Sequence, residues 1–160
     1  MVISSIKTRS AAVADLDDIN RVIDAAVLSW DLPERVKRLS LPTYRYTELD
    51  LQTIELVVAE QNDYIVGVAG WEQADPNDLP GKTGGLLLHG IYVDPAYHHR
   101  GIGSLLFKAA EHAAAQRGDA GLLVKAQSGA TDFFVKQGMR PVAVKNPGRD
   151  YAHRYWKALT

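Results

Sequence analysis

The N-terminal part of the chain combines a short predicted strand with a helical spacing of apolar residues. Residues 3–9 favour the strand. A helix is then predicted because apolar residues recur three or four positions apart, at Leu16, Ile19, Ile23, Ala26 and Val27. Acidic residues near its start suit the positive end of the helix dipole. A short second helix is predicted to begin at Pro33 in PERVKRL, and residues 41–52 to form a loop with some helix.

The middle of the chain carries apolar runs of strand length. Residues 54–61 (IELVVAEQ) and 64–72 (YIVGVAGWE) are separated by turn residues, so they predict a β-hairpin. Residues 74–85 predict a loop because they are rich in Pro, Gly, Asp and Asn. Residues 86–93 (LLLHGIYV) then predict a strongly apolar strand.

Helical spacing returns in the C-terminal part of the chain. The face expected to be buried consists of Ile102, Leu105, Leu106, Ala109 and Ala113. Gly118 can end this helix. Residues 121–127 predict a strand parallel to residues 86–93, because a helix joins the two. A short helix over residues 130–137, ended by Gly138, and two closing strands, MRPVAV and HRYWKAL, complete a mixed α/β fold around a central sheet.

Composition narrows the class of protein. The 160 residues predict a single domain, residues 1–160. A net charge of −1 gives no global attraction to nucleic acid or to an anionic membrane. The sequence has no cysteine, which excludes disulfides, zinc–thiolate sites and cysteine nucleophiles. The N-terminal stretch lacks the long apolar core of a signal peptide, and no apolar run is long enough to span a bilayer, so we expect a cytoplasmic protein.

The stretch YHHRGIGS, which precedes the long C-terminal helix, predicts an anion-binding turn. The first N–H groups of a helix have no partner inside the helix, and glycines at 101 and 103 let a phosphate approach the main chain. Tyr97 is expected to pack over the turn. A turn that only packs the helix against a strand is the simpler alternative. The dinucleotide-binding motif GxGxxG is incomplete, because Leu106 occupies the position of its third glycine. The P-loop motif of nucleotide-binding proteins is also incomplete, because no Gly-Lys-Ser/Thr follows.

VDPAYHHRGIGSLLFKAAEHAAAQRG resembles the acetyl-coenzyme A signature of the GNAT superfamily of N-acetyltransferases. In that signature Val-x-Pro precedes Gln/Arg-x-x-Gly-x-Gly/Ala at a helix start. The stretches IKTRSAAVADLDDI, VVAEQNDYIVGVAGW and GATDFFVKQGMRPV resemble other parts of the same family, so the resemblance covers nearly the whole chain.

The resemblance implies the single-domain GNAT fold, in which parallel strands 86–93 and 121–127 splay apart and the pantetheine arm of acetyl-CoA lies between them. It assigns main-chain donors to Ile91, Tyr92 and Val93. It assigns the cofactor cradle to His98, His99, Arg100, Gly101, Ile102, Gly103 and Ser104. His98 departs from the Gln or Arg that the family prefers at that position.

Phe134 is a second departure, at a position that the resemblance also places beside the cofactor. Many family members have a tyrosine there, which protonates the leaving thiolate, and Phe134 has no hydroxyl. The acid role is therefore in doubt or belongs to another residue, for which Tyr92, Ser128 and Tyr151 are candidates.

His89 and Glu72 are the candidate bases. His89 lies in an apolar strand, and a histidine pKa of about 6.5 suits a base near neutral pH. The alternative for His89 is a buried, hydrogen-bonded histidine without a catalytic part. Glu72 ends the preceding strand, where a solvated carboxylate is the alternative. No metal is expected, because adjacent histidines in a turn point apart and no carboxylates cluster with them.

The acceptor region is expected to involve the two N-terminal helices, the loop over residues 73–84 and the last strands. Aromatic residues gather in these segments: Trp30, Tyr44, Tyr46, Trp71, Tyr155 and Trp156. They could hold an amine, or they could be packing residues. Lys125, Lys136 and Lys145 are candidates for the 3′-phosphate of coenzyme A, or else solvated lysines.

The resemblance implies transfer of an acetyl group from acetyl-CoA to a primary amine of a small molecule or peptide, by direct attack in a ternary complex. Phe134 keeps a second interpretation open, a non-catalytic acyl-CoA-binding sensor or partner module of GNAT fold. A nucleotide-binding module unrelated to coenzyme A is a third. Dimers are common in the family, so a homodimer is a further possible state of this protein.

Overall fold

The computed structural model describes residues 5–81, 84–126, 128–143 and 153–159. Contacts between residues divide the chain into two compact units. The first unit holds residues 1–70 and 91–106, and the second unit holds residues 71–90 and 107–160.

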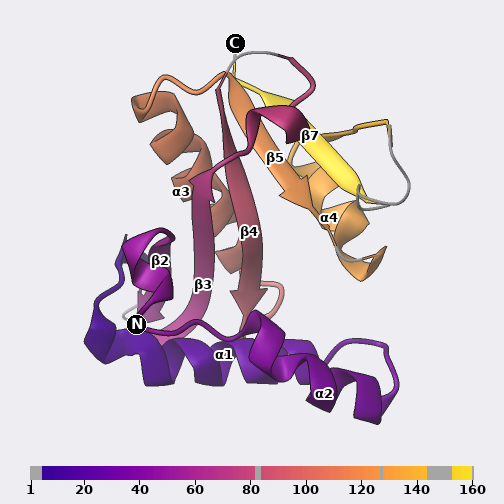
Figure 1. The fold of residues 1–160 in the computed structure, drawn as a ribbon. Helices are drawn as coiled ribbons and strands as arrows, with labels where there is room; N and C mark the ends of the chain where they lie inside the picture. Colours follow the sequence, from indigo (N-terminus) through magenta and orange to yellow (C-terminus); the bar gives the residue numbers. More distant parts are fainter. Residues whose placement is uncertain (1–4, 82–83, 127, 144–152, 160) are drawn as a thin grey trace. The chain divides into compact units, whose positions relative to one another are not determined.

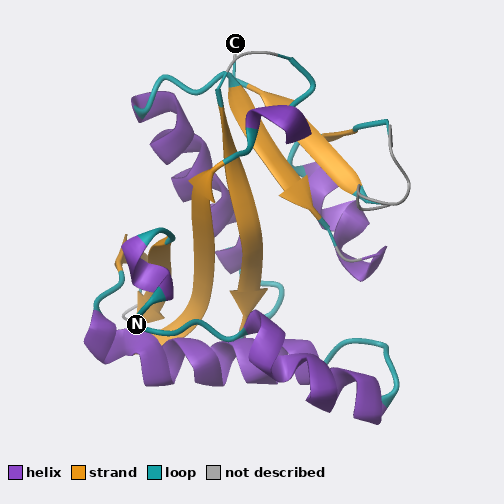
Figure 2. Cartoon of the chain, viewed as in Figure 1, coloured by secondary structure: helices purple, strands orange, loops and turns teal. Residues whose placement is uncertain are grey.

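The strands of the described residues form one mixed sheet (Figure 2). They are β1 (Lys7–Ser10), β2 (Glu55–Gln61), β3 (Tyr64–Gln73), β4 (Gly85–Val93), β5 (Gly121–Lys125), β6 (Arg140–Pro141) and β7 (Arg154–Ala158). Their order in the sheet is β1-β2-β3-β4-β5-β7-β6. β4 and β5 are parallel, whereas β1 with β2, β5 with β7 and β6 with β7 are antiparallel. The mixed α/β fold is thereby confirmed.

The α-helices of the described residues are α1 (Leu16–Leu28), α2 (Glu34–Tyr44), α3 (Ile102–Gln116) and α4 (Thr131–Lys136) (Figure 1). The glycines predicted to end α3 and α4 are confirmed, because Gly118 has φ 74° and Gly138 has φ 92°. A left-handed residue is the common end of a helix, and glycine reaches that conformation without a steric penalty. No helix in the described part of the chain is long and apolar enough to cross a membrane.

The core of the first unit forms around α1. The helical spacing is confirmed: the residues that α1 buries are Ile19, Val22, Ile23, Ala26 and Val27. They pack with buried residues of β2 and β3, among them Leu56, Val58 and Val68. Complete burial of each large aliphatic side chain stabilises the fold by about 1.5–3 kcal/mol.

Helix α2 is longer than the short helix predicted from PERVKRL. It continues to Tyr44 and includes Pro42 in its last turn. Leu41 is buried in the core of the first unit, which favours the added turn. The Lys37 side chain, only 5% exposed, donates hydrogen bonds to the carbonyls of Leu28 (2.8 Å) and Trp30 (3.1 Å). This ammonium satisfies carbonyl groups at the end of α1 that have no partner within the helix.

The predicted hairpin is confirmed as β2 and β3. Asn62 and Asp63 at its turn have φ values of 52° and 63°. Two successive left-handed residues are the pattern of a two-residue hairpin turn, and Asn and Asp tolerate it better than other residues.

In the second unit, β5 lies between β4 and β7. The parallel register of β4 and β5 runs from Gly85–Gly121 to Leu88–Val124. A Cβ at Gly121 would collide with the Trp156 ring of β7, and a Cβ at Gly85 would lie 3.1 Å from the same ring. The two glycines therefore leave the space that the indole occupies.

The buried face of α3 is rotated from the predicted one. Ile102 and Leu106 are buried as expected, but the other buried residues are Phe107, Ala110 and Ala114. Leu105, Ala109 and Ala113 are only partly buried. Phe107 accounts for the difference, because its large ring is fully buried and lies 6.4 Å from the Phe134 ring of α4.

Candidate functional site

His89 of β4 and Glu72 of β3 lie side by side in the second unit. The distance from His89 Nε2 to Glu72 Oε1 is 3.3 Å. The two side chains are 30% and 32% exposed, so solvent and a ligand can reach them. From the sequence these residues are separate candidate bases, and the structure brings them together as a pair.

The alternation of side chains along β4 places His89 on the less buried face of the strand. Leu87, Ile91 and Val93 share that face and are partly buried, whereas Leu86, Leu88 and Tyr92 on the other face are buried. The predicted sharing of a face is confirmed. The burial that the alternative for His89 assumed is wrong, because His89 is an exposed residue of the strand, whereas its catalytic role stays a prediction.

A histidine beside a carboxylate is a common arrangement for moving protons. The carboxylate orients the ring and stabilises the imidazolium that forms when the ring accepts a proton. Because Glu72 lies against Nε2, the other ring nitrogen, Nδ1, is left to accept a proton from a substrate.

β4 extends beyond its pairing with β5. The register ends at Leu88–Val124, and β4 continues through Ile91, Tyr92 and Val93. On the β3 side, the N–H of Asp94 donates to the carbonyl of Val66 at 2.9 Å. A regular strand that is paired on one side presents every second N–H group along its other edge, so that edge can offer at most two of the predicted main-chain donors Ile91, Tyr92 and Val93. The predicted strand over 121–127 ends at Lys125, and Gln127 lies outside the described residues.

The predicted cradle is an exposed turn of the first unit that leads into α3. His99 has φ 64° and Gly101 has φ 77°, so two left-handed residues flank Arg100. Alternating backbone conformations of this kind direct successive N–H groups toward one side and form an anion-binding concavity. His98 and Arg100 are exposed as well, so a ligand can reach the turn from solvent.

The residues after Arg100 anchor the turn and leave room beside it. Ile102 is 2% exposed and holds the first residue of α3 in the core, so only its main chain can face a ligand. A Cβ at Gly101 would meet no atom within 4 Å. Gly101 is therefore required by its backbone conformation, not by crowding. Gly103 and Ser104 follow in the first turn of α3.

Neither Phe134 nor Tyr92 is placed to act as the acid. Phe134 is 4% exposed and packs against Phe133 with ring centroids 5.1 Å apart. Tyr92 is buried among aromatic residues on the β4 face opposite His89. Burial raises the pKa of Tyr92, which makes its hydroxyl a weaker acid. The other acid candidates, the Ser128 side chain and Tyr151, lie outside the described residues.

The structure divides the predicted aromatic group between the two units. In the first unit the Trp30 and Tyr44 rings lie 5.2 Å apart, and Tyr44 lies 6.3 Å from Tyr92. In the second unit Trp71 is buried and is a core residue, 1% exposed. Trp156 is partly buried and packs near Leu123.

Two of the predicted phosphate-binding lysines lie in the described residues. Lys125 Nζ lies 3.4 Å from the carboxylate of Asp78, so an acidic partner already holds it. Lys136 is exposed at the end of α4. Lys145 lies outside the described residues. The described residues contain no group of three or more His, Asp or Glu side chains that could hold a metal ion.

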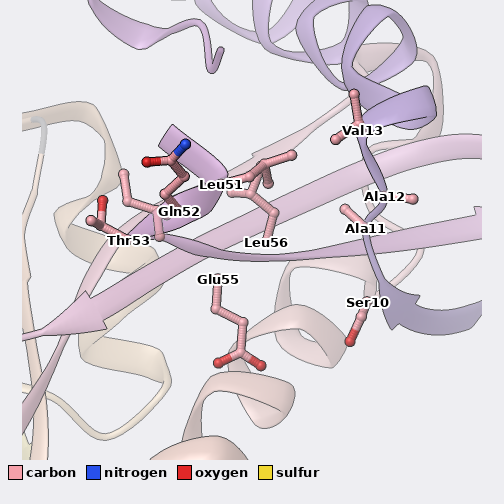
Figure 3. Close-up of a pocket in the computed structure, with 10 residues that line it drawn as sticks. Ser10, Ala11, Ala12, Val13, Leu51, Gln52, Thr53, Glu55 and Leu56 are labelled. Atoms are coloured by element: carbon pink, nitrogen blue, oxygen red, sulfur yellow. The ribbon is translucent and has the colours of Figure 1, made fainter. Parts of the chain in front are cut away.

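Described residues line a pocket in each of the two units. One of about 490 Å³ lies in the first unit, lined by Ser10, Ala11, Ala12, Val13, Leu51, Gln52, Thr53, Ile54, Glu55 and Leu56 (Figure 3). None of the predicted site residues is among its described lining. The other, of about 290 Å³, is lined by Pro80, Arg140, Pro141, Val142, Ala143 and Trp156. Its lining comes from the loop after β3 and from the last strands. Both segments were expected to form part of the acceptor region.

Comparison with known proteins identifies the family. Residues 24–139 match the acetyltransferase (GNAT) family, so the chain belongs to that family. No curated protein matches the sequence.

Solved structures show the same fold at low sequence identity. The PaiA N-acetyltransferase of Thermoplasma acidophilum, in complex with coenzyme A, is 16% identical, with 96% of this chain and 99% of that chain covered and a TM-score of 0.78. A GCN5-related N-acetyltransferase of Rhodopseudomonas palustris is 24% identical, with 99% of each chain covered and a TM-score of 0.75. A GNAT family acetyltransferase of Brucella melitensis, in complex with acetyl-CoA, is 16% identical, with 99% and 90% covered and a TM-score of 0.66.

Proposed function

We propose that this acetyltransferase moves an acetyl group from acetyl-CoA to a primary amine of a small molecule or peptide, within a single domain. Membership of the GNAT family supports the acetyl transfer. The observation that carries the amine part is the contact of His89 with Glu72. An alkylammonium has a pKa of about 10.4, so it must lose a proton before it can attack, and a histidine–carboxylate pair can accept that proton.

Binding of the donor is assigned to the turn from His98 to Ser104. Its left-handed residues, His99 and Gly101, and the start of α3 offer main-chain N–H groups to the diphosphate of acetyl-CoA. Two similar structures were solved with coenzyme A or acetyl-CoA, which supports this choice of ligand. The N–H groups at the unpaired edge of β4, in the segment Ile91–Val93, would stabilise the oxygen of the tetrahedral intermediate. Phe134 is also proposed to lie beside the donor, as the resemblance to the family implies.

The proposed reaction is a direct transfer. His89 Nδ1 accepts a proton from the ammonium, and the neutral amine nitrogen that results attacks the thioester carbonyl carbon and loses its second proton to water. Glu72 stabilises the resulting imidazolium. The carbon–sulfur bond then breaks, and the thiolate of coenzyme A takes a proton from water, because Phe134 has no hydroxyl and Tyr92 is buried. His89 returns its proton to solvent.

The non-catalytic acyl-CoA-binding module is the second candidate function. The packing of Phe134 favours it, because the aromatic ring at this position is buried and carries no proton donor. A cytoplasmic location and a homodimer remain predictions from the sequence.

A thiol-release assay with acetyl-CoA and a panel of amines separates the two functions. The panel should contain polyamines, amino acid amides and peptides with free N-termini. We expect amine-dependent release of coenzyme A. Calorimetry with coenzyme A, NAD and ATP is the control for the ligand. Binding of coenzyme A without turnover across the panel would support the module, and selective tight binding of NAD would contradict both functions.

A further inference from the structure

Four side chains of the first unit, from α1, β3 and the turn before α3, lie in a row that ends at the predicted cradle. The guanidinium carbon of Arg21 lies 4.4 Å from the centre of the Tyr64 ring. The Tyr64 and Tyr97 rings lie 6.2 Å apart, tilted by 33°. The guanidinium carbon of Arg100 lies 5.0 Å from the centre of the Tyr97 ring. We call this row the arginine–tyrosine stack.

The end of the stack at α1 is firmly held. Arg21 donates a hydrogen bond to the Ile65 carbonyl at 2.9 Å and lies 3.5 Å from the carboxylate of Asp94. Asp94 in turn accepts a hydrogen bond from the Ala96 N–H at 3.0 Å, and its carbonyl accepts one from the Tyr97 N–H at 2.8 Å. The backbone and the ring of Tyr97 are thus fixed to α1 and β3.

The end of the stack at the cradle is exposed. Arg100 lies between the left-handed residues His99 and Gly101 and reaches solvent. An exposed arginine samples many rotamers, and fixing it costs roughly 1.5–2 kcal/mol in side-chain entropy. Contact with an aromatic ring offsets part of that cost before any ligand arrives.

Stacking leaves the hydrogen-bonding groups of the guanidinium usable. The guanidinium carbon of Arg100 lies over the face of the Tyr97 ring. A contact with the face of an aromatic ring takes up no N–H group of the guanidinium in a conventional hydrogen bond. An arginine held in this way presents a planar set of donors that can bind two phosphate oxygens. The tyrosine therefore determines where those donors lie.

We propose that Tyr97 is a positioning residue for the diphosphate of acetyl-CoA and that it acts through Arg100. The inference rests on the proposed function, because it assumes that the cradle binds coenzyme A. Tyr97 carries its effect through the face of its ring, so its hydroxyl is dispensable. The stack lowers the cost of binding the donor, so its loss raises the Kd and KM for the donor and leaves kcat unchanged.

A double-mutant cycle measured by calorimetry with coenzyme A tests the proposal. A cation–π contact at an exposed site corresponds to about a two- to fivefold change in affinity, so Tyr97→Leu should raise the Kd by about that factor. Tyr97→Phe should bind like the native protein. In the Arg100→Gln background, Tyr97→Leu should have no further effect.

Pantetheine, which lacks the diphosphate, is the matched control ligand. Its binding should not change in Tyr97→Leu. Additive effects of Tyr97→Leu and Arg100→Gln, or equal losses with both ligands, would show that Tyr97 only supports the fold and would overturn the inference. A native protein that binds no coenzyme A would contradict the proposed function itself. A native protein that binds coenzyme A, together with an unchanged Kd in Tyr97→Leu, would overturn only the role of Tyr97.

Discussion

His89 Nε2 lies 3.3 Å from Glu72 Oε1, although the two residues come from different strands and are separated by the loop that joins them. Both side chains are about one-third exposed. The contact therefore has the two properties that proton transfer to an incoming amine requires, a partner for the imidazolium and access for a substrate.

Glu72 is expected to act as a positioning residue for His89. Glu72→Gln should lower kcat at pH 7 by about tenfold and leave the Kd for coenzyme A unchanged, because the amide cannot stabilise an imidazolium. In the His89→Ala background the same change should have no further effect. Glu48→Gln, at an exposed residue, is the control. A larger loss in Glu72→Gln than in His89→Ala would instead identify Glu72 as the base.

Gly103 is expected to be essential for donor binding. Gly103→Val should raise the Kd for coenzyme A by more than about 100-fold, because the side chain would occupy space that the phosphate needs. The helix itself should persist, since valine is no worse than glycine inside a helix. Calorimetry measures the effect, and Ala115→Val on the exposed face of the same helix is the control. Unimpaired binding by Gly103→Val would refute the cradle.

His99 is a site of backbone strain. Its φ of 64° lies in the left-handed region, which costs an L-residue roughly 1–2 kcal/mol and is worst for a β-branched side chain. His99→Val should lower the free energy of unfolding in urea by about 1–2 kcal/mol, whereas His99→Gly should change it by less than about 1 kcal/mol. His98 has φ −62°, so His98→Val is the matched control. Equal stability of His99→Val and His98→Val would argue against the strain.

Asp15 is expected to make stability depend on pH. Arg9 donates to both of its carboxylate oxygens, at 2.8 and 3.0 Å, and this hydrogen bonding lowers the pKa of Asp15. A lowered pKa stabilises the folded state above the unfolded value, about 3.9 for aspartate, and that stability is lost as pH falls through the folded pKa.

The measurement is urea unfolding of the native protein and Asp15→Asn at several pH values. The difference between them should be fully present above about pH 5 and should shrink steadily below about pH 4. Asp17→Asn, at an exposed position of α1, controls for loss of a carboxylate. A difference that stays constant down to pH 3 would contradict the assignment.

Local patterns were sufficient for most of the fold. Each of these patterns determines the structure only of residues a few positions away in the sequence. They are the spacing of Ile19 and Ile23, the turn residues of the hairpin, and the glycines that end helices. The sequence could not predict the buried face of α3 correctly, because burial of Phe107 depends on Phe134, which is remote in the chain. The extent of α2 likewise depends on the burial of Leu41 in the core of the first unit.

The sequence identified the individual residues of the candidate site but not the contacts between them. His89 and Glu72 were each recognisable, but their contact depends on the register of β3 and β4, and a slip by one residue would place them on opposite faces. The arginine–tyrosine stack carried no sequence signal beyond the packing expected of Tyr97. Its members come from a helix, a strand and a turn, and only the tertiary fold brings them together.

The pH dependence of kcat in the native protein and in His89→Ala tests the central claim most directly. The neutral imidazole is the active form, so the native kcat should rise with pH and then level off. His89→Ala should lower kcat at pH 7 by about 100-fold, lose that rise and bind coenzyme A as the native protein does. His112→Ala, at an exposed histidine of α3, should match the native profile. An unchanged pH–rate profile in His89→Ala would exclude His89 as the base and contradict the account.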